Sequence, residues 1–231
     1  MPSENRLYLR QAQIGPMANF VYILGDTVTR KAAVVDPAWD VGAICDFVSK
    51  EGYEIDKILI THYHPDHLGG KMMGQSIEGA AEMLARVKAK VYLNKHEADG
   101  AKKVTGLSDS DLVKVEAGDT LKVGEIEVKF LHTPGHTPGS QCFLAGGNLI
   151  SGDTLFVNSC GRVDLPGSDP AAMYHSLNTT LKALDDATVV YPGHAYSSES
   201  STTIADQKRH NMYMRFPTLE DFLDAMGYSR G

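Results

Sequence analysis

Cysteine is scarce in this sequence, which has 231 residues but only Cys45, Cys142 and Cys160. An odd number of widely spaced cysteines predicts free thiols and not a disulfide framework. Long apolar runs are also missing, since none approaches the roughly 18–20 residues that cross a bilayer. The polar segment 1–6 lacks the apolar core of a signal peptide. We therefore expect a cytoplasmic protein with no membrane association.

Positive charge is in short supply as well. Lysine and arginine total 22 against 29 acidic residues, for a net charge of −7, and no basic cluster occurs. Nucleic-acid binding needs such clusters, so a nucleic-acid partner is not expected. No glycine-rich phosphate loop is present, which argues against a dinucleotide cofactor. A small-molecule substrate remains as the expected partner, and a homo-oligomer is possible on this composition.

Strands and helices alternate along the chain, with two β-rich blocks on either side of residue 62. Short apolar, β-branched runs predict strands at 6–11, 20–24, 32–35, 57–60, 90–93, 112–115, 121–123, 126–131, 141–144, 148–150 and 188–191. Helices are expected at 40–50, from about 77 to 87, at 94–104, from Asp169 to about 184 and at 203–213. Two packed sheets with helices on the outer faces fit this order better than one doubly wound sheet.

The segment after Gly70 is predicted to be helical. Ile77, Ala80, Leu84 and their neighbours at helical spacing form one apolar stripe. Two methionines, Met72 and Met73, precede the stripe, and we expect them in the core because methionine usually fills gaps there. The length of the chain predicts one domain over residues 1–231, with a short helical tail from about 197 to 231.

Four potential metal ligands lie within six residues of one another, at His62, His64, Asp66 and His67. They follow the predicted strand at 57–60, and Gly69 and Gly70 allow a turn after them. On an extended segment, His62 and His64 face the same side, and a turn at Pro65 brings the other two to a second position. One loop can therefore supply ligands to two metal ions, and a merely histidine-rich surface loop is the weaker interpretation.

Three further clusters complete the set of ligands, and each includes Gly or Pro. They are His136 within Thr-Pro-Gly-His-Thr-Pro-Gly, Asp153 within Gly-Asp-Thr-Leu-Phe, and His194 within Pro-Gly-His. Five histidines and two aspartates exceed the three protein ligands of an ordinary catalytic zinc site. They suit two metals about 3.5–4 Å apart that share a carboxylate. We assign His62, His64 and His136 to the first metal, Asp66, His67 and His194 to the second, and Asp153 to both.

Other candidate residues have structural roles as alternatives. His132 competes with His136, but the turn residues around His136 favour it, and His96, His175 and His210 have no motif support. Asp36, at the end of a strand, either forms a turn or accepts a hydrogen bond from a ligand imidazole. Tyr63 can pack or support the ligands. Arg162 can bind a substrate carboxylate or form a surface ion pair, and Cys160 is expected to be a buried neutral thiol.

The order and spacing of these four motifs resemble those of the metallo-β-lactamase-fold superfamily, over about residues 10–196. Gly152–Phe156 together with Ser159–Arg162 is most similar to its glyoxalase II-like branch. The resemblance implies an α/β fold, the αββα four-layer sandwich of two mixed sheets. It also implies a binuclear site at the seven positions and a hydroxide shared by two metals as the nucleophile. The bridging Asp153 distinguishes the chain from true β-lactamases.

Two departures from glyoxalase II bear on the substrate. Only some 35 residues follow the His194 loop, too few for the helical domain that helps to bind glutathione there. The segment between Gly70 and Lys90 also looks longer than is usual for that branch. We expect a metallo-hydrolase, with a thioester as the first choice of substrate and a lactone or other ester as the second.

The expected cofactors are two divalent metal ions, most simply Zn²⁺, with Fe or Mn as alternatives. Asp66 would orient the hydroxide as well as bind the metal, which makes it the catalytic candidate. Persulfide dioxygenases share the fold and motifs but bind one iron, which the resemblance would assign to His62, His136 and Asp153. A non-catalytic metal-binding module is the third possibility.

Overall fold

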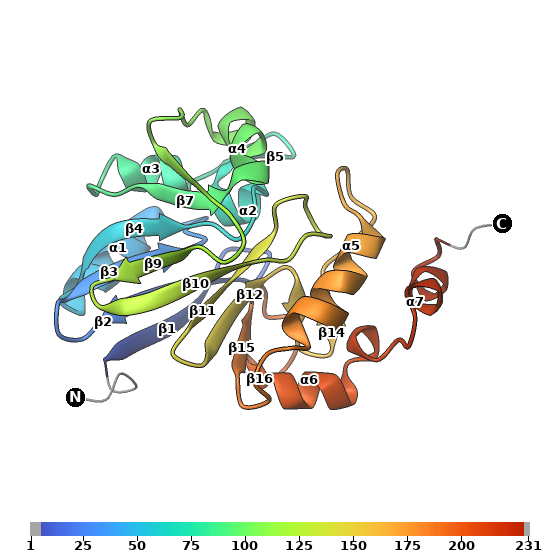
Figure 1. Cartoon of the computed structure of the whole chain (residues 1–231). Coiled ribbons are helices and arrows are strands. Elements are labelled where there is room, and N and C mark those ends of the chain that lie inside the picture. The colour runs from blue at the N-terminus through green and yellow to red at the C-terminus, as the bar shows by residue number, and fades with distance from the viewer. Residues whose placement is uncertain (1–5, 229–231) are drawn as a thin grey trace.

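The computed structural model describes residues 6–228 and places most strands in two six-stranded mixed sheets (Figure 1). The first sheet contains, in spatial order, β1 (Leu7–Ile14), β2 (Asn19–Asp26), β3 (Lys31–Val35), β4 (Glu54–Leu59), β7 (Val91–Asn94) and β8 (Leu112–Val115). The second contains β16 (Thr202–Thr203), β15 (Val189–Pro192), β12 (Asn148–Gly152), β11 (Gln141–Ala145), β10 (Ile126–His132) and β9 (Thr120–Val123).

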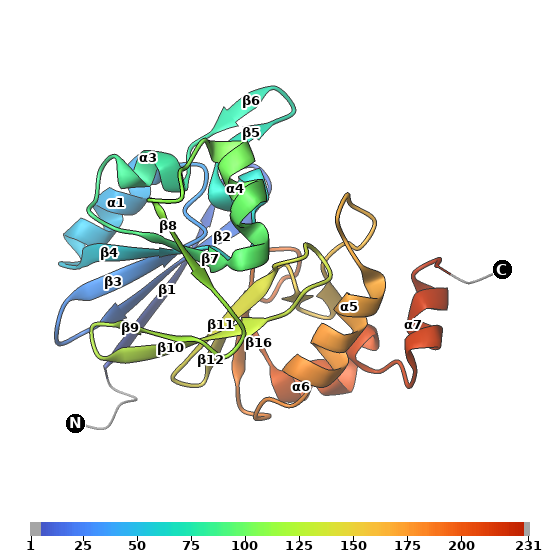
Figure 2. The ribbon, with the colours of Figure 1, turned by 45° about the horizontal axis from the view of Figure 1, so that its top comes forward.

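Helices cover the outer face of each sheet (Figures 1 and 2). Over the first sheet lie α1 (Val41–Lys50), α3 (Ala80–Leu84) and α4 (Ala98–Thr105), the last preceded by the 3₁₀ turn η2 (Lys95–Glu97). Over the second lie α5 (Pro170–His175), the π-helical segment η3 (Ser176–Leu181), α6 (Ile204–His210), the 3₁₀ turn η4 (Met212–Met214) and α7 (Leu219–Ala225). The predicted four-layer αββα sandwich is confirmed.

Three apolar layers hold the sandwich together. Between the sheets, the rings of Phe130 and Phe143 meet edge to face, with centroids 5.4 Å apart. The second layer lies under α1, α3 and α4, and the third lies between the second sheet and α5, η3, α6 and α7. Burial of these apolar surfaces is the main force that stacks the layers.

Two predicted helix starts are confirmed by their caps. The carboxylate of Asp40 accepts a hydrogen bond from the Ala43 N–H at the start of α1. The carboxylate of Asp169 accepts two, from Ala171 and Ala172, at the start of α5. Each cap satisfies backbone N–H groups that a helix leaves without internal partners.

The helix predicted after Gly70 is present as α3 (Ala80–Leu84), but it begins later and is shorter than predicted. A hairpin of β5 (Gly70–Met72) and β6 (Gln75–Ile77) precedes it and extends from the body of the molecule (Figure 2), and α3 contains only five residues. Met73 and Gly74 both have positive φ, as a tight hairpin turn requires. The side chain of Met73 is 99% exposed, so its expected place in the core is wrong.

The predicted helix 203–213 begins correctly but ends early. Thr203 caps α6 by accepting from the Asp206 N–H. The backbone leaves the helical conformation at Asn211, whose side chain accepts from the Tyr213 N–H and so starts η4. Of the predicted tail from 197 to 231, residues 229–231 lie outside the described part.

Parallel strand pairs in both sheets direct their carboxyl ends to one rim. β3 and β4 run parallel in the first sheet, with α1 between them in the chain, and β12 and β15 run parallel in the second. Loops after such strands are the usual place for functional side chains. Between residues 6 and 228, no helix is both long and apolar enough to cross a membrane.

Candidate metal centre

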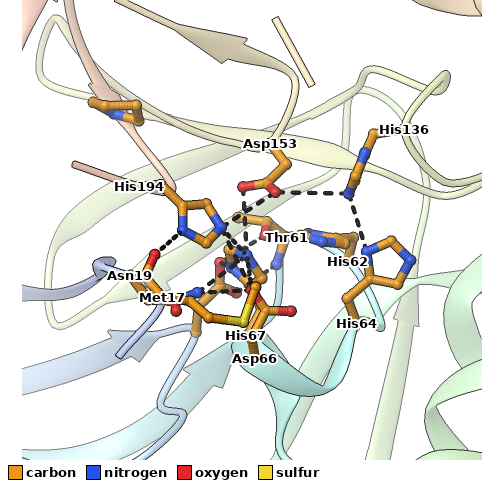
Figure 3. A network of polar contacts seen from close by, with 12 residues as sticks. Met17, Asn19, Thr61, His62, His64, Asp66, His67, His136, Asp153 and His194 are labelled. Atoms are coloured by element: carbon orange, nitrogen blue, oxygen red, sulfur yellow. Dashed lines mark hydrogen bonds and ion pairs between the residues drawn. The ribbon is translucent and has the colours of Figure 1, made fainter. Parts of the chain in front are cut away.

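The structure brings all seven predicted ligand positions together at this rim (Figure 3). The loop after β4 and the short helix α2 (Pro65–Leu68) carry the first four. The loop between β10 and β11 supplies His136, while the ends of β12 and β15 supply Asp153 and His194. Except for half-buried His64, all are buried.

His62, His64 and His136 form the first compact group. The Nδ1 atom of His64 lies 3.0 Å from Nε2 of His136. The Nδ1 atom of His136 donates to the backbone oxygen of Arg162 over 2.8 Å. This bond fixes the tautomer of His136 and leaves Nε2 with a lone pair directed at His64.

Asp66, His67 and His194 form the second group. The Nε2 atoms of His67 and His194 face each other at 3.1 Å. Each ring donates through its other nitrogen, from Nδ1 of His67 to Asp36 over 3.0 Å and from Nδ1 of His194 to the Met17 oxygen over 2.9 Å. Both rings therefore direct a lone pair toward the same point.

Asp153 lies between the two groups, as Figure 3 shows. Its Oδ2 atom is 3.6 Å from Nε2 of His136 and 3.4 Å from Nε2 of His194, and its Oδ1 atom is 3.4 Å from Nε2 of His67. One carboxylate thus faces rings of both groups, as a ligand shared by two ions would.

Protonation states at the site suit cation binding. Burial, followed by the neighbouring imidazoles, lowers the pKa of His64 to about 4 and that of His62 far below its ordinary value. Both rings are therefore neutral near pH 7 and keep a lone pair. Burial also lowers the pKa of His67, but the carboxylates of Asp153 and Asp66 outweigh it and raise that pKa. The field that favours a proton there would favour a metal cation too.

The cluster fits divalent metal ions by its own geometry. Facing imidazole lone pairs repel each other unless a metal cation or a proton lies between them. His62 Nε2 and Asp153 Oδ1 are buried and have no hydrogen-bond partner within residues 6–228, although such groups are almost always paired in proteins. Imidazole nitrogens with carboxylate oxygens are ligands for zinc and for iron.

Of its two predicted roles, a turn residue or the acceptor that orients a ligand imidazole, Asp36 has the second, because its carboxylate accepts from Nδ1 of His67. Besides accepting from His67, its carboxylate accepts from the N–H of Thr61 at 2.8 Å and from its hydroxyl at 2.6 Å. The Thr61 oxygen in turn lies 3.0 Å from Nδ1 of His62. Gly152 leaves room for this threonine, because a Cβ there would come within 2.6 Å of it.

Asn19 and Trp39 belong to the site but were not predicted. The Trp39 indole N–H, which can only donate, bonds to Oδ1 of Asn19 over 2.9 Å. The amide nitrogen of Asn19 must then point the other way, where it donates to Oδ2 of Asp66 over 3.0 Å. The only local signal for Asn19 was that a polar residue starts the buried strand β2. Its hydrogen-bond partners lie far away in the sequence and give no local pattern.

Tyr196 was also missed. Its ring stacks on His194 with centroids 4.6 Å apart, and 61% of the residue is exposed. Phe156 contacts both rings edge to face. These two aromatic residues and Met17, which is 37% exposed, border the second group of ligands.

The remaining candidates lie outside the cluster. His132 bonds to the Pro138 oxygen over 3.0 Å and stacks on His96, whereas His175 and His210 are exposed. The side chain of Arg162 is exposed and pairs with Asp164 over 2.8 Å. Cys160 is half-buried and not buried as predicted, but burial of its thiol raises the pKa to about 12, which keeps it neutral. Tyr63 packs its ring against Gly100.

Two stacked sheets with a buried histidine–aspartate cluster at one rim define a class of metalloprotein. The chain belongs to the metallo-beta-lactamase superfamily, which it matches over residues 14–194.

Relatives with several activities resemble this chain. It is 30% identical to the "probable polyketide biosynthesis zinc-dependent hydrolase PksB" of Bacillus subtilis, covering 89% of this chain and 85% of that one. It is 36% identical to a hydroxyacylglutathione hydrolase of Rhodopseudomonas palustris, covering 79% of this chain but 64% of the relative. The crystal structure of ETHE1 from Myxococcus xanthus matches with a TM-score of 0.81 and 31% identity, covering 95% and 90% of the two chains.

Proposed function

We propose that the protein is a binuclear metal-dependent hydrolase that cleaves a thioester by attack of hydroxide on its carbonyl carbon. The observation that carries the proposal is the pairing of two compact three-residue groups around one shared carboxylate, Asp153. When bound, two divalent ions, most simply Zn²⁺, lower the pKa of a water to about 7 and polarise the carbonyl.

The residues of the chain have separate roles in this proposal. His62, His64 and His136 would hold the first ion, Asp66, His67 and His194 would hold the second, and Asp153 would be a ligand to both. Oδ2 of Asp66 accepts from the amide of Asn19 over 3.0 Å and lies 3.4 Å from Nε2 of both His67 and His194, so it is the oxygen that would bind the second ion. The other oxygen would accept a hydrogen bond from the attacking water. In this proposal Asp66 is the catalytic carboxylate, which would orient the nucleophile toward the carbonyl.

The border of the site supports an acyl substrate with an apolar and an anionic part. Met17, Phe156 and Tyr196 offer apolar surface beside the second group. Arg162 is tied to the site through its backbone oxygen, and its guanidinium can exchange the exposed Asp164 for a substrate carboxylate. The hydroxyacylglutathione hydrolase relative favours a thioester, and a lactone or other ester is the alternative substrate.

A mononuclear iron persulfide dioxygenase is the second candidate function, because the chain is 26% identical to the human protein named "persulfide dioxygenase ETHE1, mitochondrial", covering 96% of this chain and 81% of that one. That activity would use His62, His136 and Asp153 as the iron ligands. Within residues 6–228, the candidate ligand atoms form three compact groups, two of which are the halves of the binuclear set and the third of which is His62, His67 and Asp153. His62, His136 and Asp153 do not form such a group together, and the third group links the two halves of the binuclear set. The geometry therefore favours the hydrolase.

A His194→Ala variant separates the two functions. In a binuclear hydrolase, removing His194 should reduce the metal content from two equivalents toward one and lower thioester hydrolysis by orders of magnitude. In a mononuclear oxygenase, the variant should keep its iron and consume oxygen with a persulfide substrate. Hydrolysis of a hydroxyacylglutathione and oxygen uptake with glutathione persulfide, measured on the same preparations, would decide between them.

A further inference from the structure

Glu97 is a buried carboxylate that neither group of ligands contains. It ends the 3₁₀ turn η2, just before α4, and its exposed fraction is 0%. Its Oε2 atom accepts the backbone N–H of Tyr63, and its Oε1 atom accepts that of Gly139, each over 2.6 Å. Both distances are short for N–H···O bonds, as expected for a charged acceptor.

The two N–H groups belong to the two loops that hold the first group of ligands. Tyr63 lies between His62 and His64, on the loop that follows β4 in the first sheet. Gly139 lies three residues after His136, on the loop between β10 and β11 in the second sheet. Glu97 therefore connects loops from different sheets beside the contact of His64 with His136, whose ring nitrogens are 3.0 Å apart.

Glu97 and the Tyr63 ring are closely packed against two glycines. A Cβ at Gly139 would lie 2.6 Å from Cγ of Glu97, and a Cβ at Gly100 would lie 2.8 Å from the Tyr63 ring. Other bonds join the same loops nearer the sheets, where Gln141 donates to the backbone oxygens of Ile60 and Thr61. Glu97 fixes the outer parts of the loops, where His64 and His136 are attached.

Ionising a carboxyl group at this depth is costly, so its two partners must favour the charge. Burial raises the pKa of Glu97 to about 7, and the N–H groups of Tyr63 and Gly139 oppose that rise. An apolar side chain at this position could not bind the two N–H groups, so the acid has a structural use: it joins the two loops.

We propose that Glu97 is a positioning residue for the first metal ion: it sets the separation of His64 and His136 without contacting ion or substrate. The inference rests on the proposed metal centre. Residues that orient metal ligands typically change metal affinity by about 10–100-fold when they are replaced. Loss of Glu97 should therefore weaken binding of the first ion more than binding of the second, because its two bonds go to Tyr63, between His62 and His64, and to Gly139, three residues after His136.

The test compares Glu97→Gln with wild type and with Asp99→Asn, whose side chain is 97% exposed in the adjacent α4. The glutamine keeps the size of the side chain but sets an N–H₂ group against one of the two N–H donors. Chelator competition with Zn²⁺ would measure the two binding steps, and apo-protein thermal unfolding would report folding. We expect one step to weaken by about 10–100-fold and the other to stay within about twofold.

Gly139→Ala is the second variant, which keeps the charge but displaces the carboxylate, and it should weaken the same step. Gly139→Ala keeps the inference testable if Glu97→Gln does not fold. Equal weakening of both steps, or wild-type binding in both variants, would overturn the inference. The failure of the proposed function looks different: wild type itself would then bind fewer than two ions or hydrolyse no thioester. If wild type binds a single ion, the affinity for that ion still tests the role of Glu97. His136 is a proposed ligand in both the binuclear and the mononuclear assignment.

Discussion

Four of the five clustered imidazoles have one ring nitrogen beside a protein oxygen, which leaves the other nitrogen for a metal. The oxygens belong to Thr61, Asp36, Arg162 and Met17. Such bonds select the tautomer and orient the ring before any ion binds. At the scale of single residues, the site is therefore preorganised by partners spread over the chain.

Replacing Asp153 tests the shared ligand. We expect Asp153→Asn to lose far more metal than an exposed control such as Asp99→Asn, because an amide is a weaker ligand and both ions depend on this residue. Metal analysis after gel filtration measures the effect. Two retained equivalents together with normal hydrolysis would contradict the binuclear assignment.

Replacing each histidine of the β10–β11 region tests the choice of ligand. His136→Ala should abolish hydrolysis, since Nε2 of His136 faces His64 and Asp153. His132→Ala should keep most of it, because that ring bonds to the Pro138 oxygen and stacks on His96. Turnover rates of the two purified variants are the measurement, and the reverse order would show that the wrong histidine was chosen.

The residues of the cluster could be predicted from the sequence because side chains that can bind metal are confined to few residue types, which occur here in short motifs. Their supports could not. Asn19 lies 47 residues from Asp66, and Glu97 lies 42 from Gly139. Asparagine and glutamate are common in polar segments, and nothing local marks the two that become buried when the sheets stack.

At the scale of elements, local pattern succeeded where caps and apolar spacing agreed. α1 begins after Asp40 and buries Val41, Ile44 and Val48, as the spacing indicates. After Gly70 the apolar stripe suggested a helix, but Gly70 and Gly74 take positive φ values and Ile77 pairs with Gly70 across the hairpin. Backbone conformation that glycine permits outweighed side-chain periodicity there.

Met73, in the turn of the β5–β6 hairpin, and Met83, in α3, give a matched test of where the buried helix begins. Met73→Ala should change the free energy of unfolding by less than about 0.5 kcal/mol, since its side chain is in solvent. Met83→Ala, in α3, should cost about 2–5 kcal/mol because that side chain is fully buried. Urea unfolding measures both. A large loss at Met73 would mean that the hairpin packs against the body of the protein.

At the scale of the whole molecule, the sheets are joined at both ends of β2. Asn19 begins this strand at the metal centre, and Asp26 ends it. The buried carboxylate of Asp26 pairs with Arg6 over 2.8 Å and accepts the Glu125 N–H, from the second sheet, over 2.9 Å. Burial opposes the charge, but Arg6 and these N–H bonds outweigh it and lower the pKa of Asp26 below its ordinary value.

This pair predicts a pH dependence of stability. A depressed pKa in the folded state stabilises the protein above the unfolded-state pKa of about 4, and the contribution is lost as pH falls below it. Asp26→Asn should thus cost about 2–3 kcal/mol near neutral pH, and less at about pH 3. Urea unfolding of both proteins at the two pH values measures this, and a difference independent of pH would contradict it.

The count of metal ions per chain tests the central claim most directly. Protein purified without chelators and analysed by elemental mass spectrometry should contain two divalent ions per chain, because Asp153 joins two complete groups of ligands. The same preparation should hydrolyse a thioester and lose that activity when the ions are removed. A single iron per chain, with oxygen consumed in the presence of glutathione persulfide, would contradict the account.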